Sequence, residues 1–556
     1  MLKMNNFRLI LSTIVLLVVI FVFLTSRAGA QIPAFTRQDS LRGSITPERA
    51  WWDLVYYHLN IRVNPADSTI TGKNTIRFKV LEGQNILQID LQPPMKITKV
   101  EKSGKNLEFE QDGNVWFITI PDKSAVGQID EIGVFYEGKP KVSKRPPWDG
   151  GIAWTKDKDG KPLVASACQG DGASLWWPCK DHMYDEPDSM LISVTAPDNL
   201  LDVSNGRLRG FDQNSDGTQT WHWFVSNPIN NYGVNINIGD YTQFSEVFKG
   251  EKGNLDCDYY VLKYNLEKAK KHFKEAPRML EAFEHWFGPY PFYEDSYKLV
   301  EVPYPGMEHQ SSVTYGNGFK NGYTGRDISQ TGWGDRFDFI IVHESGHEWF
   351  ANNITYRDIA DMWVHESFIA YSEGLFVEYF WGKEAGAEYL RGVRSNIQND
   401  KPIIGFYDVN YSGSGDMYPN GANMLHTLRQ IVNDDEKWRN ILRGLNEKFY
   451  HQTVCGKQIE GFLEEKSGLN LKGFFDQYLR DTRIPTLEYR FFNNWLEYRW
   501  GNCVEDIEMP VKVYLDKEEM WLFPKKNWSD IKIISSKKHV LKIDPDFYVA
   551  GFEIAP

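Results

Sequence analysis

Residues 339–350, FIIVHESGHEWF, decide how the rest of the chain is interpreted. The segment is mostly apolar, with no proline and one glycine, which predicts a buried helix. Residues four positions apart on a helix are neighbours, so His343 and His347 can share one metal ion. Glu344 can reach a water on that metal without occupying a coordination position. This is the H-E-x-x-H zinc pattern, although two partly buried, hydrogen-bonded histidines would give the same spacing.

A third ligand follows at a suitable distance. Eighteen residues separate His347 from Glu366, which lies in a second segment of helical pattern, WVHESFIAYSE, at residues 363–373. Two histidines and one carboxylate leave a zinc ion one open position, as catalysis requires. Glu373 lies two helical turns after Glu366 and so faces the same side. Glu373 either accepts the free N–H of a ligating histidine or is a surface carboxylate, and both roles stay open.

This pattern resembles the M1 (gluzincin) zinc aminopeptidases, relatives of aminopeptidase N. The match consists of H-E-x-x-H, eighteen residues, and then a glutamate within W-x-x-E-x-F-x-x-Y-x-E. The resemblance implies an N-terminal all-β domain of saddle or sandwich type and a thermolysin-like, mainly helical catalytic domain. It also implies one zinc ion per chain, with His343, His347 and Glu366 as ligands and Glu344 as the general base.

Two further segments match the family on either side of this pattern. By one match, Gln169 reaches into the active site and hydrogen-bonds the N-terminal end of the substrate. The alternative for Gln169 is a polar turn residue in a glycine-rich loop. By the other match, Tyr418 is the catalytic tyrosine, whose hydroxyl stabilises the tetrahedral oxyanion beside the zinc. Asn420 replaces the lysine that the family usually has after this tyrosine.

A third match is altered. The family motif G-x-M-E-N corresponds here to residues 305–309, PGMEH, in which Pro305 and His309 replace the usual glycine and asparagine. Met307 and Glu308 are kept and are expected to contact the substrate. A carboxylate at Glu308 can bind a free α-amino group through charge-assisted hydrogen bonds. The alternative is a structural carboxylate, paired with His309.

The N-terminus has the pattern of an export signal. Basic residues precede an apolar run at residues 9–24, and AGA at residues 28–30 offers a cleavage site. The run is short for a membrane span, so residues 1–30 are predicted to be a signal peptide, with an uncleaved anchor as the alternative. The protein is therefore expected to be periplasmic or extracellular, and to contact a membrane only if the segment is uncleaved.

The rest of the chain divides by its periodicity into an α+β multidomain protein. Alternating apolar residues predict an N-terminal β domain at residues 31–250, and helical patterns, including a helix at 265–286, predict the catalytic domain at 251–484. Alternation returns after Pro485, which predicts a small C-terminal β-sandwich at residues 485–556. The large helical C-terminal domain of many family members has no room here, so a more open active site is expected.

Composition excludes some functions. The net charge of −13 makes the chain a poor partner for nucleic acid or an anionic membrane. Five cysteines are too few for a disulfide framework and show no C-x-x-C pattern. Cys168 and Cys179 are either a disulfide pair or buried free thiols.

Together these features predict a zinc aminopeptidase that hydrolyses the N-terminal bond of peptides with a free N-terminus. Two other hypotheses stay open. One is an endopeptidase of thermolysin type that uses the same metal. The other is a non-catalytic binding protein that retains the fold.

Overall fold

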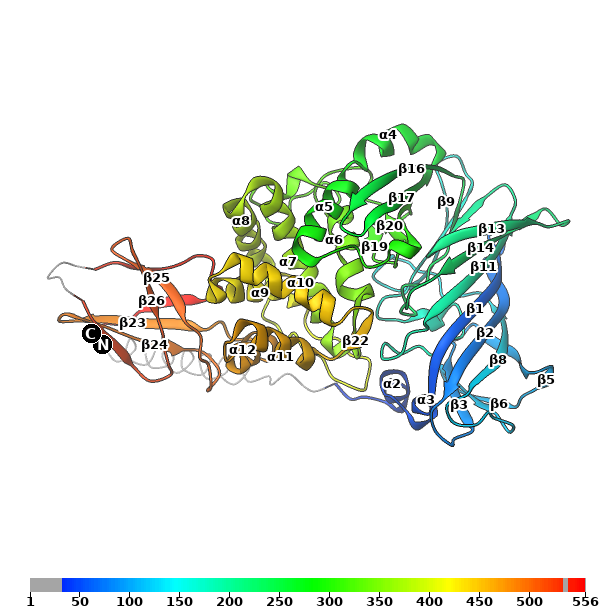
Figure 1. Cartoon of the computed structure of the whole chain (residues 1–556), viewed down its shortest axis with the longest axis horizontal. Helices are drawn as coiled ribbons and strands as arrows, with labels where there is room; N and C mark the ends of the chain where they lie inside the picture. Colours follow the sequence, from blue (N-terminus) through cyan, green and yellow to red (C-terminus); the bar gives the residue numbers. More distant parts are fainter. Residues whose placement is uncertain (1–32, 534–538, 556) are drawn as a thin grey trace, which may run out of the picture. The chain divides into compact units, whose positions relative to one another are not determined.

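The computed structural model describes residues 33–533 and 539–555, and the predicted signal peptide lies outside these ranges. The chain divides into two units, residues 1–37 and 38–556, and the domains below belong to the second. Helices α2 (Arg37–Gly43) and α3 (Pro47–Ala50) precede the first strand (Figure 1). In the described ranges, no helix combines the length and apolar character needed to cross a bilayer.

Residues 52–239 form three β-sheets, as the alternating pattern predicts. Tyr57, Leu59, Ile61 and Val63 are buried side chains of β1, and their polar neighbours face outward. The largest sheet has eight strands, in the order β13 (Arg207–Gln213), β14 (Thr218–Val225), β11 (Ser189–Pro197), β1 (Trp52–Asn64), β2 (Thr69–Val80), β8 (Ile129–Gly138), β4 (Lys96–Lys102) and β5 (Lys105–Asn106).

Two smaller sheets complete this β domain. One has the order β12 (Leu201–Val203), β15 (Asn237–Gly239), β10 (Pro162–Ala167), β9 (Gly151–Lys156), and the other β3 (Ile86–Asp90), β7 (Val115–Thr119), β6 (Phe109–Asp112). The loop after β10 carries Gln169 towards the catalytic helices.

A five-stranded sheet begins the catalytic domain. Its order is β16 (Tyr241–Gly250), β17 (Gly253–Leu262), β18 (Tyr297–Glu301), β20 (Val313–Tyr315), β19 (Gly306–Met307). The boundary expected at residue 250 falls at the turn of the β16–β17 hairpin. Because β17 also pairs with β18, the hairpin groups with the sheet that carries Met307.

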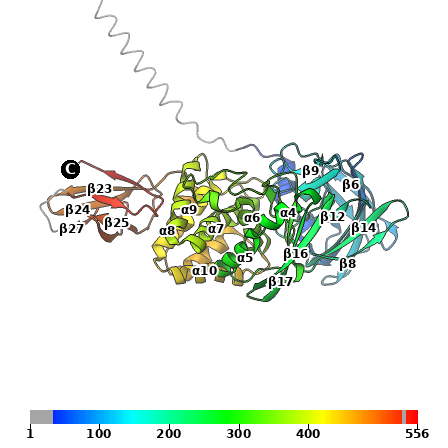
Figure 2. The same ribbon diagram turned by 90° about the horizontal axis from the view of Figure 1, so that it is seen from above.

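Helices make up the rest of the catalytic domain, and α7 packs against α5, α6, α8 and α9 (Figure 2). The helices are α4 (Leu266–His272), α5 (Glu275–Phe287), α6 (Phe339–Gly346), α7 (Trp363–Trp381), α8 (Lys383–Val393), α9 (Pro419–Val432), α10 (Asp435–Lys448), α11 (Gly456–Ser467) and α12 (Lys472–Arg480). A short parallel pair joins β21 (Ile354–Tyr356) to β22 (Gln452–Val454).

The helix predicted at residues 265–286 is wrong in one respect, because the chain forms two helices, α4 and α5. The break lies at Phe273, whose ring is buried among Tyr259, Tyr315 and Phe319. Seating this ring in the core redirects the chain between two amphipathic segments. Helical periodicity alone does not reveal such a turn.

The zinc-motif helix is also shorter than predicted. Asp338 caps α6 by accepting a hydrogen bond from the Ile341 N–H at 3.2 Å. The helix ends at Gly346, and residues Glu348–Asn352 continue as a π-helical turn. Both motif histidines nevertheless keep helical spacing, since His347 still has φ −61° and ψ −16°.

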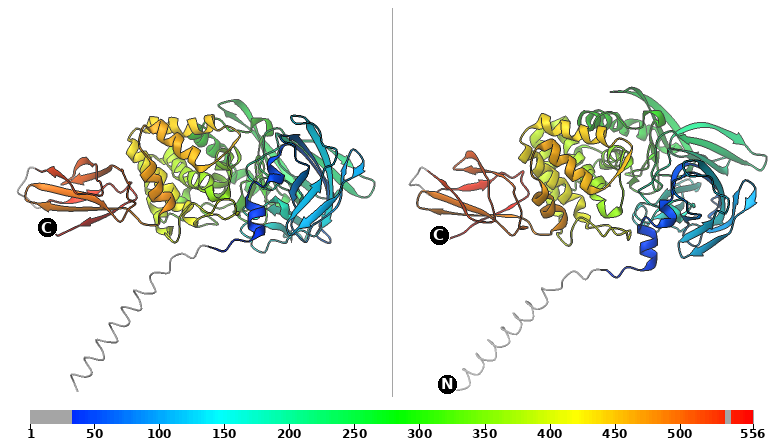
Figure 3. Two further views of the ribbon diagram at one scale, coloured as in Figure 1. Left: turned by 90° about the horizontal axis from the view of Figure 1, so that it is seen from below. Right: turned by 60° about the horizontal axis from the view of Figure 1, so that its bottom comes forward.

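The segment after Pro485 forms two sheets, as predicted, drawn in orange and red in Figure 3. They have the orders β27 (Ser529–Lys532), β24 (Trp495–Gly501), β23 (Thr486–Phe492), β29 (Ala550–Glu553) and β26 (Glu518–Leu522), β25 (Val511–Leu515), β28 (Leu541–Ile543). Tyr548 ties this region to the catalytic helices through a backbone bond to Thr427 on α9 at 3.0 Å. The possible Cys168–Cys179 disulfide is absent, because both residues are buried free thiols.

Candidate active site

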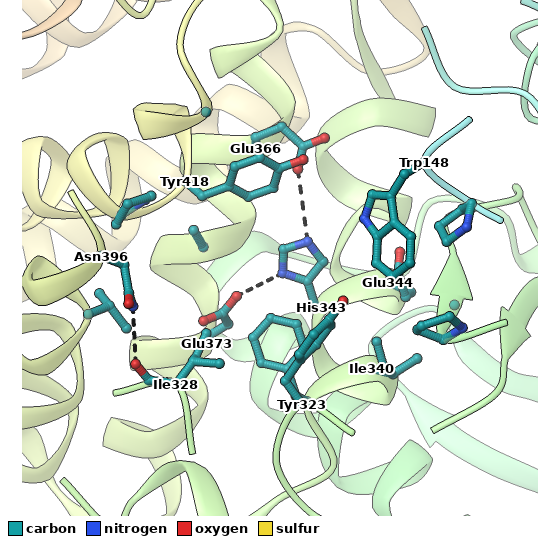
Figure 4. Close-up of a pocket in the computed structure, with 18 of the residues that line it drawn as sticks. Trp148, Tyr323, Ile328, Ile340, His343, Glu344, Glu366, Glu373, Asn396 and Tyr418 are labelled. Atoms are coloured by element: carbon teal, nitrogen blue, oxygen red, sulfur yellow. Dashed lines mark hydrogen bonds and ion pairs between the residues drawn. The ribbon is translucent and has the colours of Figure 1, made fainter. Parts of the chain in front are cut away.

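The three predicted ligands converge in the interior of the catalytic domain (Figure 4). His343 and His347 lie on α6, and Glu366 lies in the first turn of α7. The Glu366 Oε2 atom is 3.5 Å from His347 Nε2 and 3.9 Å from His343 Nε2. One ligand atom from each residue therefore lies within 4.8 Å of the other two, close enough to surround a single ion.

Each imidazole is oriented through its other nitrogen. His343 Nδ1 donates to Glu373 Oε1 at 2.7 Å, and His347 Nδ1 donates to the Phe350 carbonyl at 3.0 Å. Glu373 is 3% exposed and also accepts from the Tyr389 hydroxyl at 2.6 Å. Of the two roles considered for Glu373, the structure shows the hydrogen bond to a ligating histidine. These bonds leave both Nε2 atoms free to face the same point.

The donor set fits a zinc ion. Glu366 Oε2 is buried and has no hydrogen-bond partner in the described residues, while its Oε1 accepts from Gln169 Nε2 at 2.9 Å. Burial lowers the pKa of His343 to about 4, which keeps this imidazole neutral, and burial raises the pKa of Glu366 to about 7. A buried carboxylate oxygen beside two imidazole nitrogens is a donor set that zinc prefers.

Glu344 lies beside this cluster, one residue beyond His343 on α6. Burial raises the pKa of its carboxyl well above the ordinary value, and the nearby Glu308, Glu366 and Glu373 carboxylates raise it further. The Glu308 and Glu344 carboxylates also lie within 4.8 Å of a nitrogen of His347. A positive charge between these carboxylates would be strongly stabilised.

Glu308 is held at the edge of the five-stranded sheet. Its Oε1 accepts from the Tyr232 hydroxyl at 3.1 Å, and its backbone carbonyl accepts from Asn352 Nδ2 at 2.9 Å. Gly306 permits the approach of this edge to the zinc-motif helix, because a Cβ there would lie 2.5 Å from Ile340 Cγ2. The pairing with His309 considered from sequence is not formed, since His309 Nδ1 bonds to Thr314 instead.

Gln169 and Tyr418 both reach the site. Gln169 lies in the cleft but bonds to the carboxylate of Glu366, in addition to any contact that it makes with a substrate. The Tyr418 ring lies 6.1 Å from the His343 ring, at an interplanar angle of 24°. Burial raises the pKa of the Tyr418 hydroxyl, and the Glu366 carboxylate raises it further, so this group is a proton donor. Gly421 lets α9 approach α7, since a Cβ there would lie 2.0 Å from Ser367 Oγ.

These residues line one cleft of about 1000 Å³. The cleft also contains Met307, as predicted, and residues that sequence reasoning missed: Trp148, Tyr323 and Arg326. Trp148 is 67% exposed on a turn fixed by Asp149, which accepts bonds from the Lys144 and Arg145 N–H groups. The cluster of proline and glycine around Trp148 was the available sign of a structured turn.

Comparison with known proteins identifies the fold family. The description "Peptidase family M1 domain" matches residues 271–478, and "Peptidase M1 N-terminal domain" matches residues 54–232. Together these matches cover more than half of the chain. The chain belongs to peptidase family M1. The resemblance noted from the sequence motifs is thus confirmed, as is the multidomain fold.

Several M1 relatives are similar at low identity. Endoplasmic reticulum aminopeptidase 1 of Mus musculus is 24% identical over 314 residues, which cover 54% of this chain and 33% of that protein. Aminopeptidase N of Lactococcus lactis subsp. lactis is 23% identical over 509 residues, covering 85% and 56%. The chain thus spans about a third to a half of the length of these relatives.

A solved M1 structure is similar over most of its length. The M1 zinc metallopeptidase of Deinococcus radiodurans aligns with a TM-score of 0.65 and 19% identity, covering 79% of this chain and 96% of that one. At this identity the alignment shows the shared M1 fold.

Proposed function

We propose that this protein is an exported zinc aminopeptidase that removes the N-terminal residue of peptides. The observation that carries the proposal is the position of Glu308, which places a buried carboxylate beside the general base and the histidine–glutamate cluster. A carboxylate there binds the free α-ammonium group of a substrate through charge-assisted hydrogen bonds. Fixing the amino end in this way leaves a single peptide bond within reach of the reacting groups.

His343, His347 and Glu366 would hold one zinc ion per chain. The chemistry that zinc supplies when bound is Lewis acidity towards a carbonyl and activation of water near neutral pH. Glu373 and the Phe350 carbonyl keep the two imidazoles in the tautomer that directs Nε2 into the cluster. Gln169 holds Glu366 by its other oxygen, which directs Oε2 towards the histidines.

The remaining side chains perform the proton transfers. Glu344 takes a proton from the attacking water and passes it to the leaving amine. Its raised pKa suits a group that must both accept and release a proton near neutrality. The hydroxyl of Tyr418 donates a hydrogen bond to the oxyanion that develops on the scissile carbonyl.

The comparisons support peptide substrates. The relatives named above are aminopeptidases, and a mutant of the Deinococcus radiodurans enzyme was solved with a bound Tyr-Ser-Ala substrate. Export to the periplasm or the cell exterior is proposed from residues 1–30 alone.

The test uses purified, zinc-loaded protein and peptides of one sequence with either a free or an acetylated N-terminus. An aminopeptidase releases residues one at a time from the free peptide and leaves the acetylated peptide intact. Internal cleavage of the acetylated peptide would instead indicate an endopeptidase. No cleavage of either peptide, together with no stoichiometric zinc, would indicate a non-catalytic protein on this fold.

A further inference from the structure

A tight turn at residues 323–326 forms one wall of the cleft. Tyr323 and Arg326 close it with two backbone hydrogen bonds, of 2.8 and 3.1 Å, and Thr324 and Gly325 between them have φ of 52° and 88°. Positive φ at both central residues is the signature of a type I′ turn. Residues that oppose each other across such a pair project to the same face. Accordingly, both Tyr323 and Arg326 line the cleft.

The turn is fixed to the zinc-motif helix. The Gly322 N–H donates to the Phe337 carbonyl at 2.8 Å, immediately before α6 begins. The Asn317 side chain bonds to the Gly322 carbonyl at 2.9 Å and to Asp338, the helix cap, at 2.9 Å. The direction of the turn is therefore set by the same helix that carries the catalytic residues.

Aromatic contacts give the distance from the metal cluster. The Tyr323 ring packs on the Phe339 ring at 5.3 Å, and Phe339 stacks on His343 at 5.0 Å (Figure 4). These two steps put Tyr323 at most about 10 Å from His343, the span of about three extended residues. Burial and then Glu344 raise the pKa of Tyr323, whereas Arg326 lowers it, so the phenol lies within electrostatic reach of both.

Arg326 differs in charge from the rest of the cleft. Among the described lining residues it is the only lysine or arginine, whereas seven carboxylate residues line the same space. Its guanidinium is exposed and makes no hydrogen bond or ion pair with another described residue. The adjacent Asp327 carboxylate is engaged by Ser329 N and Oγ, at 2.8 and 2.6 Å, and by Gly332 N at 2.6 Å.

The cleft therefore has two ends of opposite character. Glu308 accepts the ammonium group at one end, and the metal cluster and Tyr418 receive the first carbonyl. A peptide bound in this way continues past the scissile bond. The guanidinium lies within about three extended residues of the metal cluster, where it can meet a carboxylate of that peptide.

We propose that Arg326 binds a carboxylate two or three residues beyond the scissile bond, and that the enzyme therefore favours short peptides with a negative charge there. The inference rests on the proposed aminopeptidase function. The carboxylate is either the C-terminus of a tri- or tetrapeptide or an acidic side chain in a longer peptide. Both present the planar pair of oxygens that a guanidinium binds in bidentate fashion.

The test compares kcat/KM for tri- and tetrapeptides as free acids and as C-terminal amides. A second arm uses amidated tetrapeptides with Glu or Gln at the third or the fourth position. The enzymes are the wild type, Arg326→Gln, Arg326→Lys and the control Arg336→Gln. Arg336 lies in the same segment but packs on Trp333 and does not line the cleft. An aminoacyl nitroanilide, which has no carboxylate, reports the basal activity of every variant.

We expect the wild type to prefer the carboxylate about fivefold in at least one arm, the upper range for a solvent-accessible ion pair. Arg326→Gln should reduce the preference below twofold, Arg326→Lys should keep part of it, and the control should match the wild type. The arm that shows the effect identifies the source of the carboxylate. A wild type without any preference, or a preference that survives in Arg326→Gln, overturns the inference. No hydrolysis of the nitroanilide or any free peptide by zinc-loaded wild type would overturn the aminopeptidase function, and the inference with it.

Discussion

Replacing Glu373 with glutamine tests how far the support of a ligand sets zinc affinity. The carboxylate accepts from His343 Nδ1 at 2.7 Å and from the Tyr389 hydroxyl at 2.6 Å, and it is 3% exposed. Glutamine has the same shape and can still accept from His343 through its carbonyl oxygen. The substitution therefore removes the negative charge and leaves the packing intact.

The expected loss follows from the role of such partners. A carboxylate behind a ligating histidine fixes the ring and raises its basicity, and removing it typically costs 10–100-fold in metal affinity. This corresponds to about 1.4–2.7 kcal/mol. We expect Glu373→Gln to fall within this range, because the hydrogen bond survives but loses the assistance of the charge.

The assay is a zinc titration of metal-free protein in competition with a fluorescent chelator. Tyr389→Phe is the matched control, since it removes a donor to Glu373 but keeps its bond to His343, and should weaken zinc binding less than about threefold. A Kd for Glu373→Gln within twofold of the wild type would refute the reasoning. A larger loss in Tyr389→Phe than in Glu373→Gln would also do so.

Three further predictions concern other parts of the cleft and its surroundings. Tyr418→Phe should lower kcat about 10²–10³-fold with little change in KM or zinc content, because one oxyanion donor is removed; an unchanged kcat would exclude that role. Trp148→Ala should raise KM for peptides about three- to tenfold if its exposed ring covers the bound chain, without altering thermal stability, since the side chain is 67% exposed; an unchanged KM would contradict this. Burial lowers the pKa of His309 to about 3, so the unfolded state takes up a proton below pH 6.5 that the folded state does not, and stability is lost as pH falls from there. Relative to the wild type, His309→Asn should therefore gain about 2 kcal/mol between pH 7.5 and pH 5, measured by urea unfolding at both values. An equal pH response in the two proteins would show that His309 is not buried in the neutral form.

The sequence predicted the parts of the site that depend on local geometry. Helical spacing alone brings His343 and His347 together, and the family pattern adds Glu366 from the next helix. Alternation predicted the β domains because a half-buried strand repeats every two residues. These features need no knowledge of distant contacts.

The parts that sequence reasoning missed depend on tertiary contacts. Tyr232 supports Glu308 from 76 residues away, and nothing near either residue signals the pair. The turn that carries Arg326 has local signals in its glycine, but its direction is set by contacts with the start of α6. The break at Phe273 likewise follows from an aromatic core that assembles from three other segments.

Metal content measured together with turnover tests the central claim most directly. The claim is that His343, His347 and Glu366 hold one zinc ion while Glu344 acts only on protons. We predict about one zinc per chain in the wild type and in Glu344→Gln, with turnover in the first and none in the second, and far less than one zinc in Glu366→Ala. Full zinc in Glu366→Ala, or near-normal turnover in Glu344→Gln, would contradict the account.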